Sequence, residues 1–151
     1  MTPETRETLQ RAHAWLADDP ATRWTTGVYA LAQQPLLPPP PGVEAPTVWP
    51  DPTPETTYQC YSWAQLAEAY AKGELLACCA AGVVGLVSMN PAGNLDYQQI
   101  DEALAALADC VAGTLTRDAS DALNDVTDWN DAARRTVRHV LDAFQRAADA
   151  P

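Results

Sequence analysis

The sequence has little positive charge. Nine lysines and arginines stand against twenty aspartates and glutamates among 151 residues, and the formal net charge is −11 at pH 7. Lysine and arginine supply most of the attraction to nucleic-acid phosphates and to anionic lipids. The composition therefore disfavours direct binding of nucleic acid or of an anionic membrane. It leaves cationic partners open, along with proteins that themselves bind nucleic acid.

Recognisable catalytic and metal-binding motifs are also missing. The chain has no glycine-rich phosphate loop, no Gly-x-Ser-x-Gly elbow and no His-Glu-x-x-His sequence. Its cysteines lack the paired spacing of structural zinc sites, and the aspartates between residues 118 and 131 lack the ligand pattern of a calcium loop. We predict no metal site and no cofactor.

A secretory signal is absent from the sequence as given, because no apolar segment follows the opening residues MTPETRETLQRAH. The four cysteines are Cys60, Cys78, Cys79 and Cys110. Adjacent cysteines rarely bond to each other, and a chain with this few cysteines is not a disulfide scaffold. We expect free thiols and a reducing, cytoplasmic setting.

One stretch without charge, Leu75 to Met89, stands out against this acidic background. Exposing it would forfeit about 25 cal/mol for each Å² of apolar surface, so we expect it to be buried. Strands usually span about 4–8 residues, and the length of this run therefore favours a single buried helix. Such a helix would reach only about 22 Å, too short for the roughly 30 Å hydrocarbon core of a membrane.

Helix start signals and amphipathic patterns surround this run. Thr2-Pro3-Glu4, Ser62 with Gln65, and Asp96 with Gln99 each predict a helix start, and a last helix begins at Asn130 or is capped by Thr136. Residues 28–33 fit either a short helix or an extended segment. We predict one domain over residues 1–151 with an all-α fold, a compact bundle of about six helices around the apolar helix.

A proline-rich segment interrupts this pattern at about residues 35–54, which hold nine of the thirteen prolines. Proline has no backbone N–H and restricts the residue before it, so neither a helix nor a central strand is expected here. We predict a surface insertion of polyproline type.

Acidic residues gather in the second half of the chain. Asp118, Asp121, Asp125 and Asp128 recur at spacings that place them on one face of a helix. A solvated face of an acidic protein would show the same pattern, as would a mimic of nucleic-acid phosphate or a docking face for a basic partner. Our hypothesis is a non-catalytic accessory protein that binds a basic protein partner through these four aspartates.

The alternative is a small cysteine-dependent enzyme. Cys79 or Cys78 would be the nucleophile, His139 the base, and Asn130 or Asp131 would orient the imidazole. The apolar surroundings of both cysteines argue against it, because burial raises the pKa of a thiol. Core packing is therefore the favoured role of these cysteines.

Three short motifs lie at the ends of predicted helices. They are Trp-x-x-Gly (Trp24 to Gly27), Cys-x-x-Gly (Cys79 to Gly82) and Trp-Asn-Asp (Trp129, Asn130, Asp131) before the last arginine-bearing helix. The set resembles a family of small uncharacterised proteins, a domain of unknown function, of actinobacteria, related bacteria and their phages. The resemblance implies a shared fold and a phage or prophage setting, and no established activity. The proline-rich insertion and the alanine after Trp-Asn-Asp depart from the pattern.

The Trp-Asn-Asp corner itself has two interpretations. Asn130 or Asp131 can cap the last helix while the indole of Trp129 fills a gap between helices. Alternatively, the corner contacts a ligand. The first interpretation is favoured.

Overall fold

The structure, a computed structural model of the chain, describes residues 1–34, 41–42, 44, 56–112 and 119–151. Along these residues the elements follow in the order α1 (Pro3–Asp18), α2 (Pro20–Arg23), β1 (Ala30–Gln33), β2 (Thr57–Cys60), α3 (Trp63–Ala71), β3 (Leu75–Cys78), α4 (Ala80–Val87), α5 (Tyr97–Ala112), α6 (Ala119–Asp131) and α7 (Val137–Asp149). A three-stranded sheet thus accompanies the helices, and the prediction of an all-α fold is wrong.

The middle strand of this sheet is β1, which pairs with β2 on one side and β3 on the other, antiparallel in both cases. Ala30 lies opposite Cys60 and opposite Cys78. The sequence of β1, ALAQ, has no marked strand preference, and pairing with the neighbouring strands determines its conformation. Residues 28–33 fit either state by sequence, and the last four of them form the central strand.

The uncharged run from Leu75 to Met89 is divided into a strand and a helix, which corrects the expectation of one helix. Cys79 separates β3 from α4, with extended backbone angles (φ −72°, ψ 173°). Its N–H donates to the carbonyl oxygen of Tyr29 at 3.0 Å, so its backbone bonds back towards the start of β1. Every residue of α4 is buried. A segment covered on all sides shows no amphipathic period. The prediction of a single helix therefore rested on the length of the run alone, which is not sufficient.

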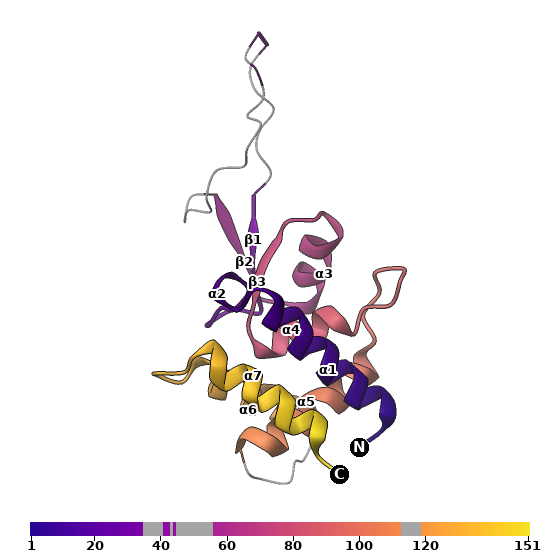
Figure 1. The fold of residues 1–151 in the computed structure, drawn as a ribbon. Coiled ribbons are helices and arrows are strands. Elements are labelled where there is room, and N and C mark those ends of the chain that lie inside the picture. The colour runs from indigo at the N-terminus through magenta and orange to yellow at the C-terminus, as the bar shows by residue number, and fades with distance from the viewer. Residues whose placement is uncertain (35–40, 43, 45–55, 113–118) are drawn as a thin grey trace.

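Four helices, α1, α3, α5 and α6, pack around α4. The longest helices form two close pairs, α1 with α7 and α5 with α6. Figure 1 shows α1 in indigo beside α7 in yellow, with the sheet at one end of the helical body. The core is contiguous across these layers and includes Leu9, Leu66, Val83, Leu104 and Phe144.

The predicted helix starts are confirmed at four places. The side chains of Thr2, Ser62 and Asp96 accept hydrogen bonds from the backbone N–H three residues later. Thr136 starts α7, where the ring of His139 accepts the Thr136 N–H at 3.2 Å and completes a capping box. These signals lie within one turn of the chain, and distant packing does not override them.

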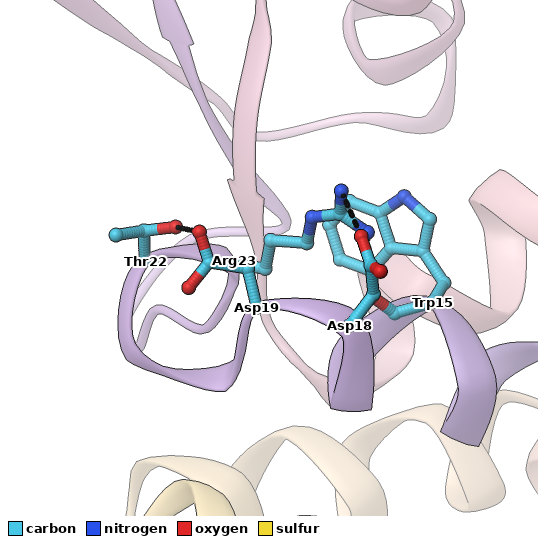
Figure 2. Close-up of polar contacts among 5 residues, drawn as sticks. All are labelled: Trp15, Asp18, Asp19, Thr22 and Arg23. Carbon is cyan, nitrogen blue, oxygen red and sulfur yellow. Dashed lines mark hydrogen bonds and ion pairs between the residues drawn. The ribbon is translucent and has the colours of Figure 1, made fainter.

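A cluster around Arg23 fixes the passage from α1 to α2. Its Nη1 donates to the carbonyl oxygen of Trp15 at 2.8 Å, and its Nη2 lies 2.7 Å from Oδ2 of Asp18. The guanidinium also covers the Trp15 ring, 5.1 Å from the centroid. Figure 2 shows this arrangement with Thr22 and Asp19, which bond to each other nearby. The cluster fixes the chain immediately before Trp24.

The predicted proline-rich insertion falls almost entirely on residues outside the described part of the chain. Its flanks are described: Gln33 at the end of β1 pairs with Thr57 at the start of β2. No helix among the described residues is long and apolar enough to cross a membrane.

Candidate functional site

Asn130 stands at a junction between three segments of the chain. It is fully buried, and its Oδ1 accepts the indole N–H of Trp24 at 2.9 Å and the N–H of Ala80 at 3.1 Å. Its Nδ2 donates to the carbonyl oxygen of Thr25 at 3.2 Å and to Oδ1 of Asp131 at 2.8 Å. Both halves of the amide are thereby used. The end of α6, the segment after α2 and the start of α4 are joined by one side chain.

Asp131 ties the same junction to the loop before β1. Its Oδ1 also accepts the N–H of Gly27 at 2.9 Å. Gly27 has φ +76°, a conformation that glycine adopts without strain. The Trp-x-x-Gly and Trp-Asn-Asp motifs, far apart in sequence, therefore meet through direct hydrogen bonds.

The Cys-x-x-Gly motif meets them from the other side. The Sγ atom of Cys79 accepts the N–H of Gly82 at 3.3 Å and so caps α4. A Cβ at Gly82 would lie 1.9 Å from the carbonyl oxygen of Tyr29, so only glycine allows α4 to approach that backbone. The motif thus seats the start of α4 against the start of β1.

Beside this junction the surface is hollowed, with a volume of about 240 Å³. Its wall is formed on one side by residues of α6, which are Leu123, Asn124, Thr127 and Asp131. The remaining wall comes from the chain before and after the first two strands and from the start of α4, namely Gly27, Val28, Tyr29, Tyr61 and Cys79. We call this feature the α6 hollow.

Cys79 lines the hollow, but its thiol is poorly suited to attack. Burial raises its pKa to about 11, the backbone N–H groups at the start of α4 oppose that rise, and the nearby charge of Asp131 adds to it. Only 2% of Cys79 is exposed, and Cys78 is fully buried with its pKa raised by the same cause. Both thiols are therefore protonated at neutral pH.

His139, the base of the enzyme hypothesis, does not line the hollow. It is exposed on the first turn of α7, where its ring bonds Thr136. Asn130, named as a possible orienting group, has its amide filled by other partners. The described contacts link His139 to neither cysteine, so the three parts of a thiol site are not assembled.

The predicted acidic face falls on α6, with one exception. Asp118 lies outside the described residues. Asp121 and Asp128 are exposed and Asp125 is half-buried, and Asp121 and Asp125 also make contacts within the protein. Because residues four apart are neighbours on a helix, Asp128 lies directly beside Asn124, which lines the hollow. The acidic side of α6 and the hollow therefore adjoin.

Trp129 packs against the hydrophobic core and is covered by Arg135, whose guanidinium carbon lies 4.2 Å from the ring centroid. Nε of Arg135 donates to the carbonyl oxygen of Trp129 at 2.9 Å. Trp129 is not among the residues of the hollow. Its surroundings support the structural interpretation of this corner, in which Trp129 is a packing residue and Asp131 alone faces outward.

Several residues of the hollow carry no sequence signal. Tyr29, Tyr61 and Thr127 belong to no motif, and their meeting depends on the register of the sheet. Among the described residues no group of three or more histidine, cysteine, aspartate or glutamate side chains could hold a metal ion.

Comparison with known proteins gives a family and no activity. No match was found among curated proteins or among solved structures. The model of one family, described as a family of unknown function (DUF6197), matches residues 1–150. The chain, with its motif residues joined at Asn130, belongs to that family.

Proposed function

We propose that the protein is a non-catalytic binding protein that docks a basic surface of another protein on the acidic side of α6, formed by Asp121, Asp125 and Asp128. The observation that supports this most is the adjacency just described. Exposed Asp128 borders a hollow whose one charged lining residue among those described is Asp131. Negative charge and a concave surface thus coincide on one helix.

The electrostatics favour such a partner. A protein with a net charge of −11 attracts cationic surfaces at long range, and this speeds association in a manner that salt weakens. Exposed carboxylates lose little hydration before contact, so their main effects are on association rate and specificity. The thiols are buried and protonated, and His139 does not line the hollow, so the enzyme alternative has no assembled site.

The test compares two variants with equal charge change. The docking variant is Asp121→Asn with Asp125→Asn and Asp128→Asn. The control variant changes three exposed acids on other helices, Glu7→Gln, Asp101→Asn and Asp142→Asn. Each form is immobilised and exposed to the lysate of the native host, and bound protein is eluted with a salt gradient.

A partner held by the wild type and the control, but lost or eluted at much lower salt from the docking variant, is the expected result. A partner retained equally by all three forms contradicts docking through α6. A phage or prophage setting and a cytoplasmic location fit such an accessory protein and remain predictions, as does the single-domain organisation.

A further inference from the structure

The size of the α6 hollow limits what can bind in it. At about 240 Å³ it is smaller than the roughly 300–1,000 Å³ of pockets that enclose drug-sized ligands or cofactors. A single side chain, or a small charged group that pairs with a charge in the hollow, would fit this volume. The hollow opens beside the acidic side of α6, so a group carried on a docked partner can reach it.

The charge of the hollow selects a cation. Asp131 is the one charged residue among those described in the lining, and no lysine, arginine or histidine accompanies it. The N–H of Gly27 and Nδ2 of Asn130 hold its Oδ1, while no hydrogen bond within the described chain occupies Oδ2. The carboxylate is therefore fixed in orientation with one oxygen left for an external donor.

An anion is disfavoured at the same place. The N–H groups of Ala80 and Gly82 at the start of α4 are bonded to Asn130 and to Cys79. A helix start whose donors are already used offers little to a phosphate or carboxylate. The charge of Asp131 would also repel it.

The remaining wall suits a flat cation better than a compact one. Tyr29 is held in place by stacking on Trp63, with ring centroids 4.6 Å apart and an angle of 12°. Tyr61, which also lines the hollow, is 65% exposed. Aromatic rings attract delocalised guanidinium groups, which also form two parallel hydrogen bonds with a carboxylate. The side-chain oxygens of Asn124 and Thr127 are further acceptors.

We propose that the α6 hollow binds the guanidinium group of an arginine, with Asp131 as its acceptor and Tyr61 as its aromatic neighbour. The proposal rests on the proposed function for the source of that arginine, which is the basic partner docked on α6. Asp131 is then a binding residue that reads one side chain, whereas Asp121, Asp125 and Asp128 supply general attraction.

The experiment uses the intact protein and small probes. Nα-acetyl-arginine amide is titrated while the ¹H–¹⁵N resonances of Gly27 and Thr127 are followed by NMR. The lysine analogue and the neutral citrulline analogue are the comparison probes. Saturable shifts with the arginine probe at millimolar concentrations, weaker binding of the lysine probe and none of the citrulline probe are expected.

Two variants locate the binding, and a third is the control. Asp131→Asn keeps an oxygen acceptor for Gly27 and Asn130 but removes the charge, and we expect about a tenfold or greater loss of affinity. Asn124→Lys leaves the Asp131 hydrogen bonds untouched and places a cation in the hollow, so it should block the probe. Asp142→Asn, on α7, matches the charge change and should bind as the wild type does.

Equal affinity of wild type and Asp131→Asn, equal binding of the lysine probe, or no saturable shift would each overturn the proposal. These outcomes are independent of partner docking, because the probes need no partner. Probe binding that depends on Asp131, together with a partner insensitive to the α6 aspartates, would reject the docking face and retain the hollow. The reverse pattern would reject the hollow alone.

Discussion

Two arginine–tryptophan pairs flank the Asn130 junction, and they are built differently. In one, Arg23 lies 5.1 Å from the Trp15 ring centroid, donates to the Trp15 carbonyl and forms an ion pair with Asp18. In the other, Arg135 lies 4.2 Å from the Trp129 ring centroid and donates to the Trp129 carbonyl. No carboxylate within the described chain forms an ion pair with Arg135.

The difference shows where this fold places charge. Arg23 precedes Trp24 and Trp129 precedes Asn130, so each pair holds one partner of the Trp24–Asn130 hydrogen bond. The ion pair is at the surface, with 68% of the Asp18 side chain exposed, where salt screens it. At the centre of the junction, the buried amide of Asn130 bonds to neutral groups of Trp24, Thr25 and Ala80. The charge of Asp131 lies at the exposed edge of the junction, which avoids the cost of burying a charge.

The largest effect should come from removing the junction that both pairs support. Asn130→Ala leaves the indole N–H of Trp24, the Ala80 N–H and the Thr25 carbonyl without their partner. We expect a loss of about 3–5 kcal/mol in the free energy of unfolding, measured by urea denaturation. A loss below about 1 kcal/mol would mean that water replaces the amide at little cost.

The next largest effect should come from removing the ring of Trp129, which belongs to the arginine–tryptophan pair without an ion pair. Trp129→Ala should lower the free energy of unfolding by about 2–4 kcal/mol, since the indole contacts the core but is only partly buried. Thermal and urea unfolding with Trp15→Ala alongside would compare the two rings. Unfolding unchanged by Trp129→Ala, combined with loss of a bound partner, would assign the ring to a binding surface.

A smaller effect separates the two arginines. Arg23→Ala and Arg135→Ala each remove a cation–π contact and a hydrogen bond to a carbonyl, but only Arg23→Ala removes an ion pair. At low salt Arg23→Ala should cost about 0.2–1 kcal/mol more, and this excess should vanish near 1 M salt. Asp18→Asn in a double-mutant cycle isolates the pair. If the additional loss of stability in Arg23→Ala persists at high salt, the two arginines differ in packing and not in the ion pair.

The smallest effect concerns Cys79, which reports opening of the junction. Burial raises its pKa to about 11, so the stability contributed by the neutral thiol is present up to about pH 9 and lost as pH rises towards 11.

A thiol-reactive dye should label native Cys79 slowly at pH 7, after half-buried Cys110. Site-resolved mass spectrometry of Arg23→Ala and Arg135→Ala should show severalfold faster labelling of Cys79. Rapid labelling of the wild type at pH 7 would revive the enzyme hypothesis.

Local signals explain which elements could be predicted. The caps at Thr2, Ser62 and Asp96 act over three residues, and these helices start where the sequence indicates. The strands depend on partners distant in sequence, such as Ala30 with Cys78, and no local pattern encodes that pairing. The error at Leu75–Met89 has two causes. The strand β3 depends on its distant partner β1, and burial of α4 on every side removes the period that distinguishes a helix from a strand.

The candidate site was predictable in part. The motif residues Trp24, Gly27, Cys79 and Asn130 were singled out, and the structure joins them, yet their spacing did not indicate that Asn130 is the centre. His139 looked like a catalytic base because histidine often is one, whereas here it completes a helix cap. Tyr61 and Thr127 meet at the hollow only because the fold brings the segment after β2 close to α6, which a single sequence does not reveal.

The pairing of Gln33 with Thr57 has a practical consequence. Since the last residue of β1 and the first of β2 are held opposite each other, the distance that any connection must span is short and fixed. Lengthening a connection between fixed ends costs only about 0.6 kcal/mol for each doubling. This position is therefore a natural place to lengthen the chain, for example by inserting a reporter domain, at little cost to the fold.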